Sequence, residues 1–270
     1  MVDVMSKIWL IAHNTFRETM RRKVLFLALL VFVLGLVQIC LSLRLLQLAN
    51  NAGEAQIAAR LRVLFPSYFM YLWQQLGSIL AIFLGAMGAS HEIAAKTIVH
   101  VLSRPIGRTQ YLIGRWLGLT IFLWLLEALG IGLALLVAEF FGVAHTPMLW
   151  LLCASFFVST MLYSGLSLSL NTWLPSVPAG IGAFFVMQMA GSSYGAQNDP
   201  NQFVRLLAVG EYYLFPATMP VNLISSSFGS GMLSPDYGLY AQVLLENVFF
   251  AGVAFAIGCM VFSRRELPMR

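Results

Sequence analysis

Long apolar segments alternate with shorter polar ones along the chain, and this pattern predicts membrane-spanning helices. A bilayer core about 30 Å thick is crossed by about 20 consecutive apolar residues in a helix. Pro175 and Pro178 stand at the start of the fifth and shortest segment, where a helix tolerates proline better than in its interior. Six segments meet or approach the required length: residues 24–43, 68–90, 111–138, 148–170, 177–190 and 241–262. The sequence therefore predicts an all-α polytopic membrane protein with six transmembrane helices.

The polar N-terminal segment 1–23 precedes the first span, and its residues 7–23 have the pattern of an amphipathic helix. At 100° per residue, one sector is apolar or small and the opposite sector is polar, while Leu10 and Ile11 break the pattern. A basic helix of this kind lies in the headgroup region, although flanking charges that only set topology are the alternative. The residues that define this predicted interfacial helix are Trp9, Phe16, Arg17, Glu18 and Arg21.

The loop 91–110, between the second and third spans, has its own helical pattern. Residues 91–103 place alanines and branched apolar residues on one face and polar residues on the other. Glu92 precedes Lys96 by four positions, the order that favours a helix, and His100 shares their face. The residue before a proline leaves the helical region, so the segment 103–107 predicts a sharp turn, flanked by Arg104 and Arg108. We expect a short amphipathic helix instead of an ordinary solvated loop.

Two further segments lie between spans on the opposite side. The stretch 191–240 is rich in Gly, Ser and Pro but also carries apolar runs, which predicts short helices packed at the outer membrane face. The segment 47–67 predicts another short outer helix.

The composition of the chain excludes a water-soluble globular protein. Only 10% of the residues are charged and 59% are hydrophobic, whereas soluble domains are about 25% charged. With a mean hydropathy of +0.81, the chain forms one transmembrane domain, residues 1–270. A net charge of +5 would suggest nucleic acid in a polar protein, but here the basic residues flank apolar segments, so no nucleic-acid partner is expected.

The distribution of basic residues predicts the orientation. Twelve of the sixteen Lys and Arg residues lie in the N-terminal segment, in the stretch from the loop after the second span to Arg115, or in the C-terminal tail. By the positive-inside rule, this side faces the cytoplasm. We therefore expect a multi-pass protein of the inner (plasma) membrane with both termini cytoplasmic.

Several kinds of chemistry are missing from the sequence. No G-x-x-x-x-G-K-[ST] loop occurs, so any ATPase must be another chain, and no metalloprotease, C-x-x-C or hydrolase motif is present. The three cysteines lie in apolar segments without pair spacing, and the methionines are too dispersed for a copper path. We expect no cofactor or metal in this chain.

Two acidic residues lie within the spans. Glu127 is near the middle of the third span, where a charge costs roughly 2.5–3.5 kcal/mol on insertion scales, and Glu246 is near the outer end of the sixth. Glu127 is expected either to hydrogen-bond between helices or to serve a polar path or subunit contact. The G-x-x-x-G pair Gly114 and Gly118 lies away from the middle of a span, so it is a weak dimerisation signal.

These segments together resemble a known family. The residues that carry the resemblance are Asn14-Thr15-Phe16-Arg17-Glu18 with Arg21 and Lys23, Glu92, Lys96-Thr97, Leu102-Ser103-Arg104-Pro105-Ile106, Arg108, Tyr111-Leu112-Ile113-Gly114-Arg115 and Arg265-Glu266-Leu267. The chain resembles the permease subunits of type-2 ABC exporters, particularly the branch that includes permeases assisting multi-copper enzyme maturation. Where that family often has Lys after the glycine, this chain has Arg115, which preserves the charge.

The resemblance implies a homodimer, or a pair with a related permease, that binds two copies of a soluble ABC ATP-binding subunit. ATP and Mg would then belong to that partner, and the loop after the second span would be its coupling helix, with Glu92, Lys96, His100, Arg104 and Arg108 as contacts. The substrate and any periplasmic accessory partner stay open. Two other classes remain: an ion-coupled secondary transporter or channel using Glu127, and a membrane enzyme or assembly scaffold.

Overall fold

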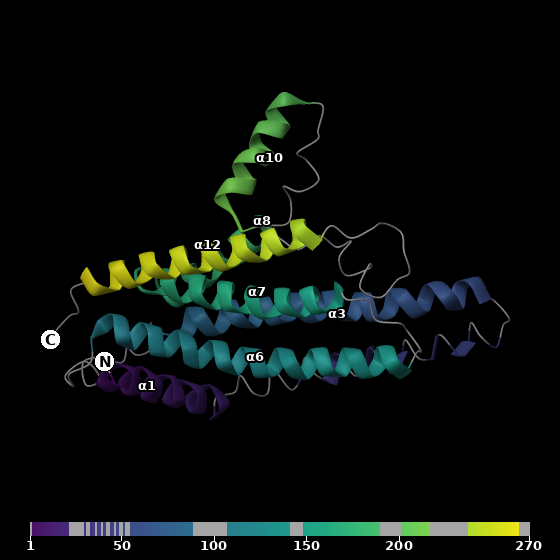
Figure 1. Cartoon of the computed structure of the whole chain (residues 1–270), viewed down its shortest axis with the longest axis horizontal. Helices are drawn as coiled ribbons and strands as arrows, with labels where there is room; N and C mark the ends of the chain where they lie inside the picture. The colour runs from purple at the N-terminus through teal and green to yellow at the C-terminus, as the bar shows by residue number, and fades with distance from the viewer. Residues whose placement is uncertain are drawn as a thin grey trace.

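A computed structural model describes residues 2–21, 55–88, 107–140, 148–189, 201–216 and 237–264, together with single positions between residues 30 and 51. These residues form helices and short turns, with no strand in the part of the chain that is described. The helices, labelled in Figure 1, are α1 (Val2–Arg21), α3 (Ala55–Gly88), α6 (Arg108–Phe140), α7 (Met148–Asn171), α8 (Ser176–Met189), α10 (Gln202–Leu214) and α12 (Tyr237–Arg264).

Four of these helices, α3, α6, α7 and α12, are long and apolar enough to cross a membrane. They correspond to the second, third, fourth and sixth predicted spans. The fifth corresponds to α8, which has only 14 residues and rises about 20 Å, less than the thickness of a bilayer core. The first predicted span, residues 24–43, lies largely outside the described residues, and the positions described within it are helical. An all-helical fold is confirmed, and the number of six spans stays a prediction.

Part of the segment 47–67, for which a short outer helix is predicted, is helical, but it is continuous with the second span. Residues 55–67 belong to α3, which continues without interruption to Gly88. Pro66 lies inside this helix, and only the apolar part that follows it, Phe69–Gly88, qualifies as a membrane span. With 34 residues, α3 is about 50 Å long and therefore exceeds the thickness of a bilayer core.

The stretch 191–240 contains one helix, α10, in its described part, and the predicted position of this stretch at the outer membrane face stays a prediction. Helix α10 begins after Asn201, whose Oδ1 accepts a hydrogen bond from the backbone N–H of Phe203 at 3.0 Å and so caps the helix. In Figure 1 α10 projects away from the bundle. Phe203, Leu206 and Leu207 are exposed on it.

The long helices lie side by side, and the start of α1 and the end of α12 lie at the same end of the bundle, the shared end (Figure 1). α6 begins and α12 ends at this end, and α1 lies beside the first part of α6. A hydrogen bond joins the two helix ends, because the Arg108 guanidinium donates to the Ser263 carbonyl at 3.2 Å. Helix α3 also ends here, because Gly88 lies beside Arg115 in the second turn of α6.

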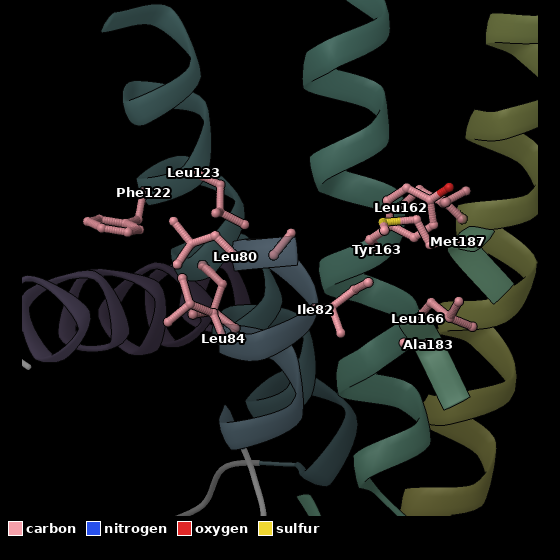
Figure 2. Packing of buried hydrophobic residues seen from close by; sticks show 13 residues of the cluster. Leu80, Ile82, Leu84, Phe122, Leu123, Leu162, Tyr163, Leu166, Ala183 and Met187 are labelled. Carbon is pink, nitrogen blue, oxygen red and sulfur yellow. The ribbon is translucent and has the colours of Figure 1, made fainter. Parts of the chain in front are cut away.

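The core lies where α3, α6, α7 and α8 meet. Leu80 and Leu84 of α3, Leu123 of α6 and Leu162 of α7 are among its buried side chains, which Figure 2 shows. A second cluster lies near the shared end of the bundle, where the Trp116 and Phe255 rings stack 4.3 Å apart.

Helix α7 holds its neighbours with polar contacts as well as apolar ones. Ser167 donates a hydrogen bond to the Ile82 carbonyl of α3 at 2.7 Å. Two indole groups of α6 bond to α7, with Trp116 donating to the Met161 carbonyl at 3.2 Å and Trp124 to the Phe157 carbonyl at 3.0 Å. Small residues and such hydrogen bonds are the usual means of association for helices in lipid, where apolar burial alone gives little drive.

Candidate functional site

Helix α6 begins at Arg108, three residues before the predicted start of the third span, and of the predicted turn 103–107 only Gly107 lies in the described part. Gly107 lies just before the helix, its N–H donates to the Gln110 side-chain oxygen at 3.2 Å, and its carbonyl accepts from the Tyr111 N–H at 3.0 Å. Arg108, the first helical residue, bonds to the end of α12 as described above. Of the five predicted coupling residues, only Arg108 lies in the described part; Glu92, Lys96, His100 and Arg104 lie outside the described residues.

Helix α1 covers most of the segment 7–23, for which an amphipathic helix is predicted, and it packs closely against α6 at two glycines. An added Cβ at Gly114 would lie 2.8 Å from the Ile8 carbonyl oxygen, and one at Gly118 would overlap the Ala12 carbonyl. One turn further on, the Phe16 and Phe122 rings meet edge to face, 6.2 Å apart. The offset between the paired positions is constant, so α1 runs parallel to the first turns of α6. The two glycines of the G-x-x-x-G pair thus pack against α1 of the same chain. From the sequence, this pair was considered only as a dimerisation signal, although its spacing is typical of close helix packing.

The faces of α1 differ in part from the predicted sectors. Ile11 is buried against α6 together with Ala12, Thr15 and Thr19, so it belongs to the packed face and does not break the pattern. Trp9, assigned to the same apolar sector, is exposed. Among the other predicted interfacial residues, Phe16 and Glu18 are partly buried, Arg17 is exposed, and α1 ends at Arg21. The position of this helix relative to the membrane surface stays a prediction.

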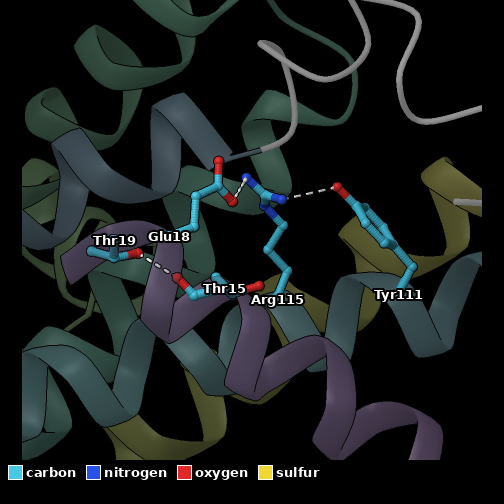
Figure 3. A network of polar contacts seen from close by, with 5 residues as sticks. All are labelled: Thr15, Glu18, Thr19, Tyr111 and Arg115. Atoms are coloured by element: carbon cyan, nitrogen blue, oxygen red, sulfur yellow. Dashed lines mark hydrogen bonds and ion pairs between the residues drawn. The ribbon is translucent and has the colours of Figure 1, made fainter. Parts of the chain in front are cut away.

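Arg115 is a buried cation between α1 and α6. Its guanidinium lies 3.7 Å from the Glu18 carboxylate, whose side chain is 39% exposed, and donates to the Tyr111 hydroxyl at 3.3 Å. Figure 3 shows Arg115 between these two partners, with Thr19 donating to the Thr15 carbonyl nearby. A buried charge is costly unless it is paired, so the pairing with Glu18 favours a docked α1.

The end of α3 completes this site. A small cavity between the three helices is lined by residues of α1, of α6 and of the last turns of α3, including Leu84 and Gly88. An added Cβ at Gly88 would lie 3.8 Å from the Arg115 Nε atom. Gly88 is the last described residue before the loop 89–106, so Arg115 lies beside the point where this loop leaves the bundle.

Glu127 lies in a different niche, between the middle parts of α3 and α6. It is 1% exposed, and its carboxylate faces Gly77 so closely that an added Cβ there would overlap it. Trp73 of α3 in turn lies against Gly130 of α6, where an added Cβ would overlap the indole ring. The indole is next to the Glu127 carboxylate, yet no described residue makes a hydrogen bond of standard geometry to either carboxylate oxygen.

The second intramembrane acid has a simple partner. Gln242, one turn earlier in α12, donates a hydrogen bond to the Glu246 carboxylate at 2.8 Å. Within the described parts of the chain, no three His, Cys, Asp or Glu side chains gather in a way that could hold a metal ion. The structure therefore brings Arg108, Arg115 and Glu18 to one end of the bundle and leaves Glu127 and Glu246 apart from them.

These features define a multi-pass, all-helical membrane protein. Comparison with protein families narrows this class, because residues 9–267 match the family described as "ABC-2 family transporter protein". The match covers nearly the whole chain, so the protein belongs to this family. No match is found among curated proteins. The chain is therefore a permease subunit of an ABC transporter, a membrane component whose family implies association with an ABC ATP-binding subunit and with the membrane.

Proposed function

We propose that the protein is the permease of an ATP-driven exporter and that its ATPase subunits act on the loop between α3 and α6. The family match over residues 9–267 carries this proposal. The arrangement of the described helices supports it, since α3 ends, α6 begins and α12 ends around the base of this loop. A force applied there reaches three long helices at once.

In this proposal two permease copies, or one copy and a related permease, bind two ATPase subunits. ATP and Mg are held by the ATPase, and this chain holds no cofactor. Closure of the ATPases displaces the coupling loop 91–110 and shifts the spans of the two permeases against each other. Glu92, Lys96 and His100 form the face that docks on the ATPase, and Arg104 and Arg108 add charge-assisted hydrogen bonds to its carboxylates.

The orientation follows from the charges. We propose that the shared end of the bundle faces the cytoplasm and that the protein lies in the inner (plasma) membrane. Reporter domains fused after Arg270 or within residues 106–109 are then cytoplasmic, and those fused within residues 53–58 or 197–201 are outside. A C-terminal reporter on the outer side would overturn this orientation.

Charge reversal in the coupling loop tests the proposal. Truncating one partner of a buried charge pair at an interface costs about 2–5 kcal/mol, so Glu92→Lys and Arg104→Glu are expected to weaken ATPase binding or to uncouple hydrolysis while the permease stays inserted. The measurements are co-purification of the ATPase and its rate of hydrolysis with the permease. Arg205→Glu, an exposed reversal on α10, is the control. Normal values in both loop variants would contradict the proposal.

An ion-coupled transporter is the second candidate, and one observation favours it. Glu127 is an ionisable residue buried among the spans, and no described residue makes a hydrogen bond of standard geometry to it; such a residue in a transporter is often a site of proton transfer. Glu127→Gln separates the two candidates, because an ATP-driven permease keeps its activity when this charge is removed and an ion-coupled one loses it.

A further inference from the structure

Helix α1 and the beginning of α6 have the geometry of one mechanical unit. The paired positions Ile8 with Gly114, Ala12 with Gly118 and Phe16 with Phe122 follow each other at a constant offset. At both glycines the backbone of α1 occupies the space in which a side chain would stand. Such close backbone contact gives a dense, rigid junction between helices.

Arg115 fastens this junction to the end of α12. Its guanidinium contacts the Glu18 carboxylate of α1 and the Tyr111 hydroxyl of α6, and it lies over the Tyr111 ring at 5.9 Å from the centroid. Tyr111 is itself buried and packs against Phe262 of α12. One side chain thus contacts α1 and α6 directly and reaches α12 through Tyr111.

The cluster of Glu18, Tyr111 and Arg115 lies next to both ends of the loop between α3 and α6. Arg115 lies beside Gly88, where α3 ends and the loop 89–106 begins, and two turns after Arg108, where the loop has ended. If α1 separated from α6, the ion pair between Arg115 and the Glu18 carboxylate would be lost, and breaking a partly buried ion pair is unfavourable. The pair therefore opposes any movement of the loop and α6 that leaves α1 behind.

We propose that Glu18 and Arg115 are positioning residues for coupling, which make α1 move with α6 when the ATPase displaces the loop. This inference rests on the proposed function. Neither residue needs to contact the ATPase or the substrate. The pair acts by transmitting the displacement of the loop to the N-terminal helix and to the span that follows it.

The test uses the assembled permease–ATPase complex in lipid nanodiscs. Glu18→Gln and Arg115→Gln are compared with Arg17→Gln, a change on the exposed face of α1 next to Glu18. We expect both pair variants to co-purify with the ATPase as the wild type does, but to lose at least about fivefold of the permease-dependent stimulation of ATP hydrolysis, the lower end of typical allosteric coupling. The control keeps full stimulation.

The charge-swapped protein Glu18→Arg/Arg115→Glu distinguishes pairing from a merely structural role, because it restores opposite charges in reversed order. We expect it to recover most of the stimulation lost in the single variants. Stimulation at the wild-type level in both single variants would overturn the inference, and so would a swap no better than either of them. Arg115→Lys keeps the positive charge and so tests the pairing without reversing it. Higher stimulation of ATP hydrolysis in Arg115→Lys than in Arg115→Gln supports the inference, and equal stimulation in the two variants contradicts it.

A cross-link reports the movement itself. In a background with Cys40, Cys153 and Cys259 replaced by Ser, cysteines are placed at Phe16 and Phe122, whose rings are in contact. We expect the same cross-linking yield with and without ATP when Glu18 and Arg115 are present, and a lower yield with ATP in Glu18→Gln. Equal yields in that variant would contradict the inference. Absence of the ATPase from the wild-type complex would instead refute the proposed function.

Discussion

Helix α6 is packed through glycines on two neighbours, α1 and α3, and each contact contains one glutamate. At the first contact Glu18 reaches from α1 to a buried arginine of α6 and stays 39% exposed to its surroundings. At the second, Glu127 of α6 is enclosed against Gly77 of α3 and has no hydrogen bond of standard geometry from any described residue. Close packing at glycines therefore supports a charge-paired junction at the end of the bundle and a largely apolar one in its middle.

The largest expected effect on stability is that of a substitution at Gly130, which packs against the Trp73 indole. In Gly130→Leu the new side chain overlaps the Trp73 indole, whereas at Gly132, two residues further along α6, no atom among the described residues lies within 4 Å of an added Cβ. We expect Gly130→Leu to lower the free energy of unfolding by about 1–3 kcal/mol or more, as overpacking does, and Gly132→Leu to change it little. Thermal unfolding in detergent checks this, and equal shifts in melting temperature would show that the α3–α6 contact is looser than described.

A substitution at the contact between α1 and α6 is expected to disturb a smaller part of the protein than Gly130→Leu does. A side chain at Gly118 overlaps the Ala12 carbonyl, so Gly118→Leu displaces α1 while the contacts among α3, α6 and α7 persist. We expect faster proteolysis of the N-terminal helix with a melting temperature close to that of Gly132→Leu. Unchanged protection of α1 would mean that the helix does not depend on this close approach.

The two glutamates are expected to respond differently to loss of charge. Glu18→Gln removes the anion beside a buried cation, and because Glu18 is partly exposed we expect a loss of about 1 kcal/mol, the upper end for exposed pairs. Denaturant unfolding of the solubilised protein measures it, with Arg17→Gln as the exposed control. A variant as stable as the wild type would show that the ion pair adds nothing to docking of α1.

The smallest effect is expected at Glu127. Glu127→Gln keeps the shape of the side chain and removes a charge from an apolar interior, so the melting temperature should stay unchanged or rise slightly. The ATPase-coupled activity should also persist. A marked loss of stability would reveal an ionic partner of Glu127, and loss of activity in a stable variant would favour the ion-coupled mechanism.

The sequence predicts the long helices well, because an apolar run of about 20 residues has few alternatives in a bilayer. The ends of α6 and α7 lie within three residues of the predicted boundaries, and α8 begins between Pro175 and Pro178 as the prolines indicate. The continuity of residues 55–67 with the second span was not predicted, because a run of mixed polarity does not reveal whether a helix ends or extends beyond its apolar part.

The contacts between helices were less accessible from sequence. Periodicity identified α1 as a helix, but it gave no account of Ile11, whose position depends on where α6 lies. The partner of Arg115 also follows from tertiary packing, since Glu18 is distant in the chain. Glu127 could be identified from sequence because burying a charge within a span is costly, but the sequence pattern did not indicate that Gly77 and Trp73 enclose it.

The central claim is that this chain is a permease driven by a separate ATPase, and its most direct test is nucleotide hydrolysis by the purified components. The tagged chain is purified in lipid from its native membrane and assayed alone and together with the soluble protein that accompanies it. The account predicts that a partner with a phosphate-binding loop co-purifies in stoichiometric amount and that ATP hydrolysis requires this partner, because the chain contains no such loop. Stoichiometric ATP binding by the isolated chain, or the same hydrolysis without the partner, would contradict it.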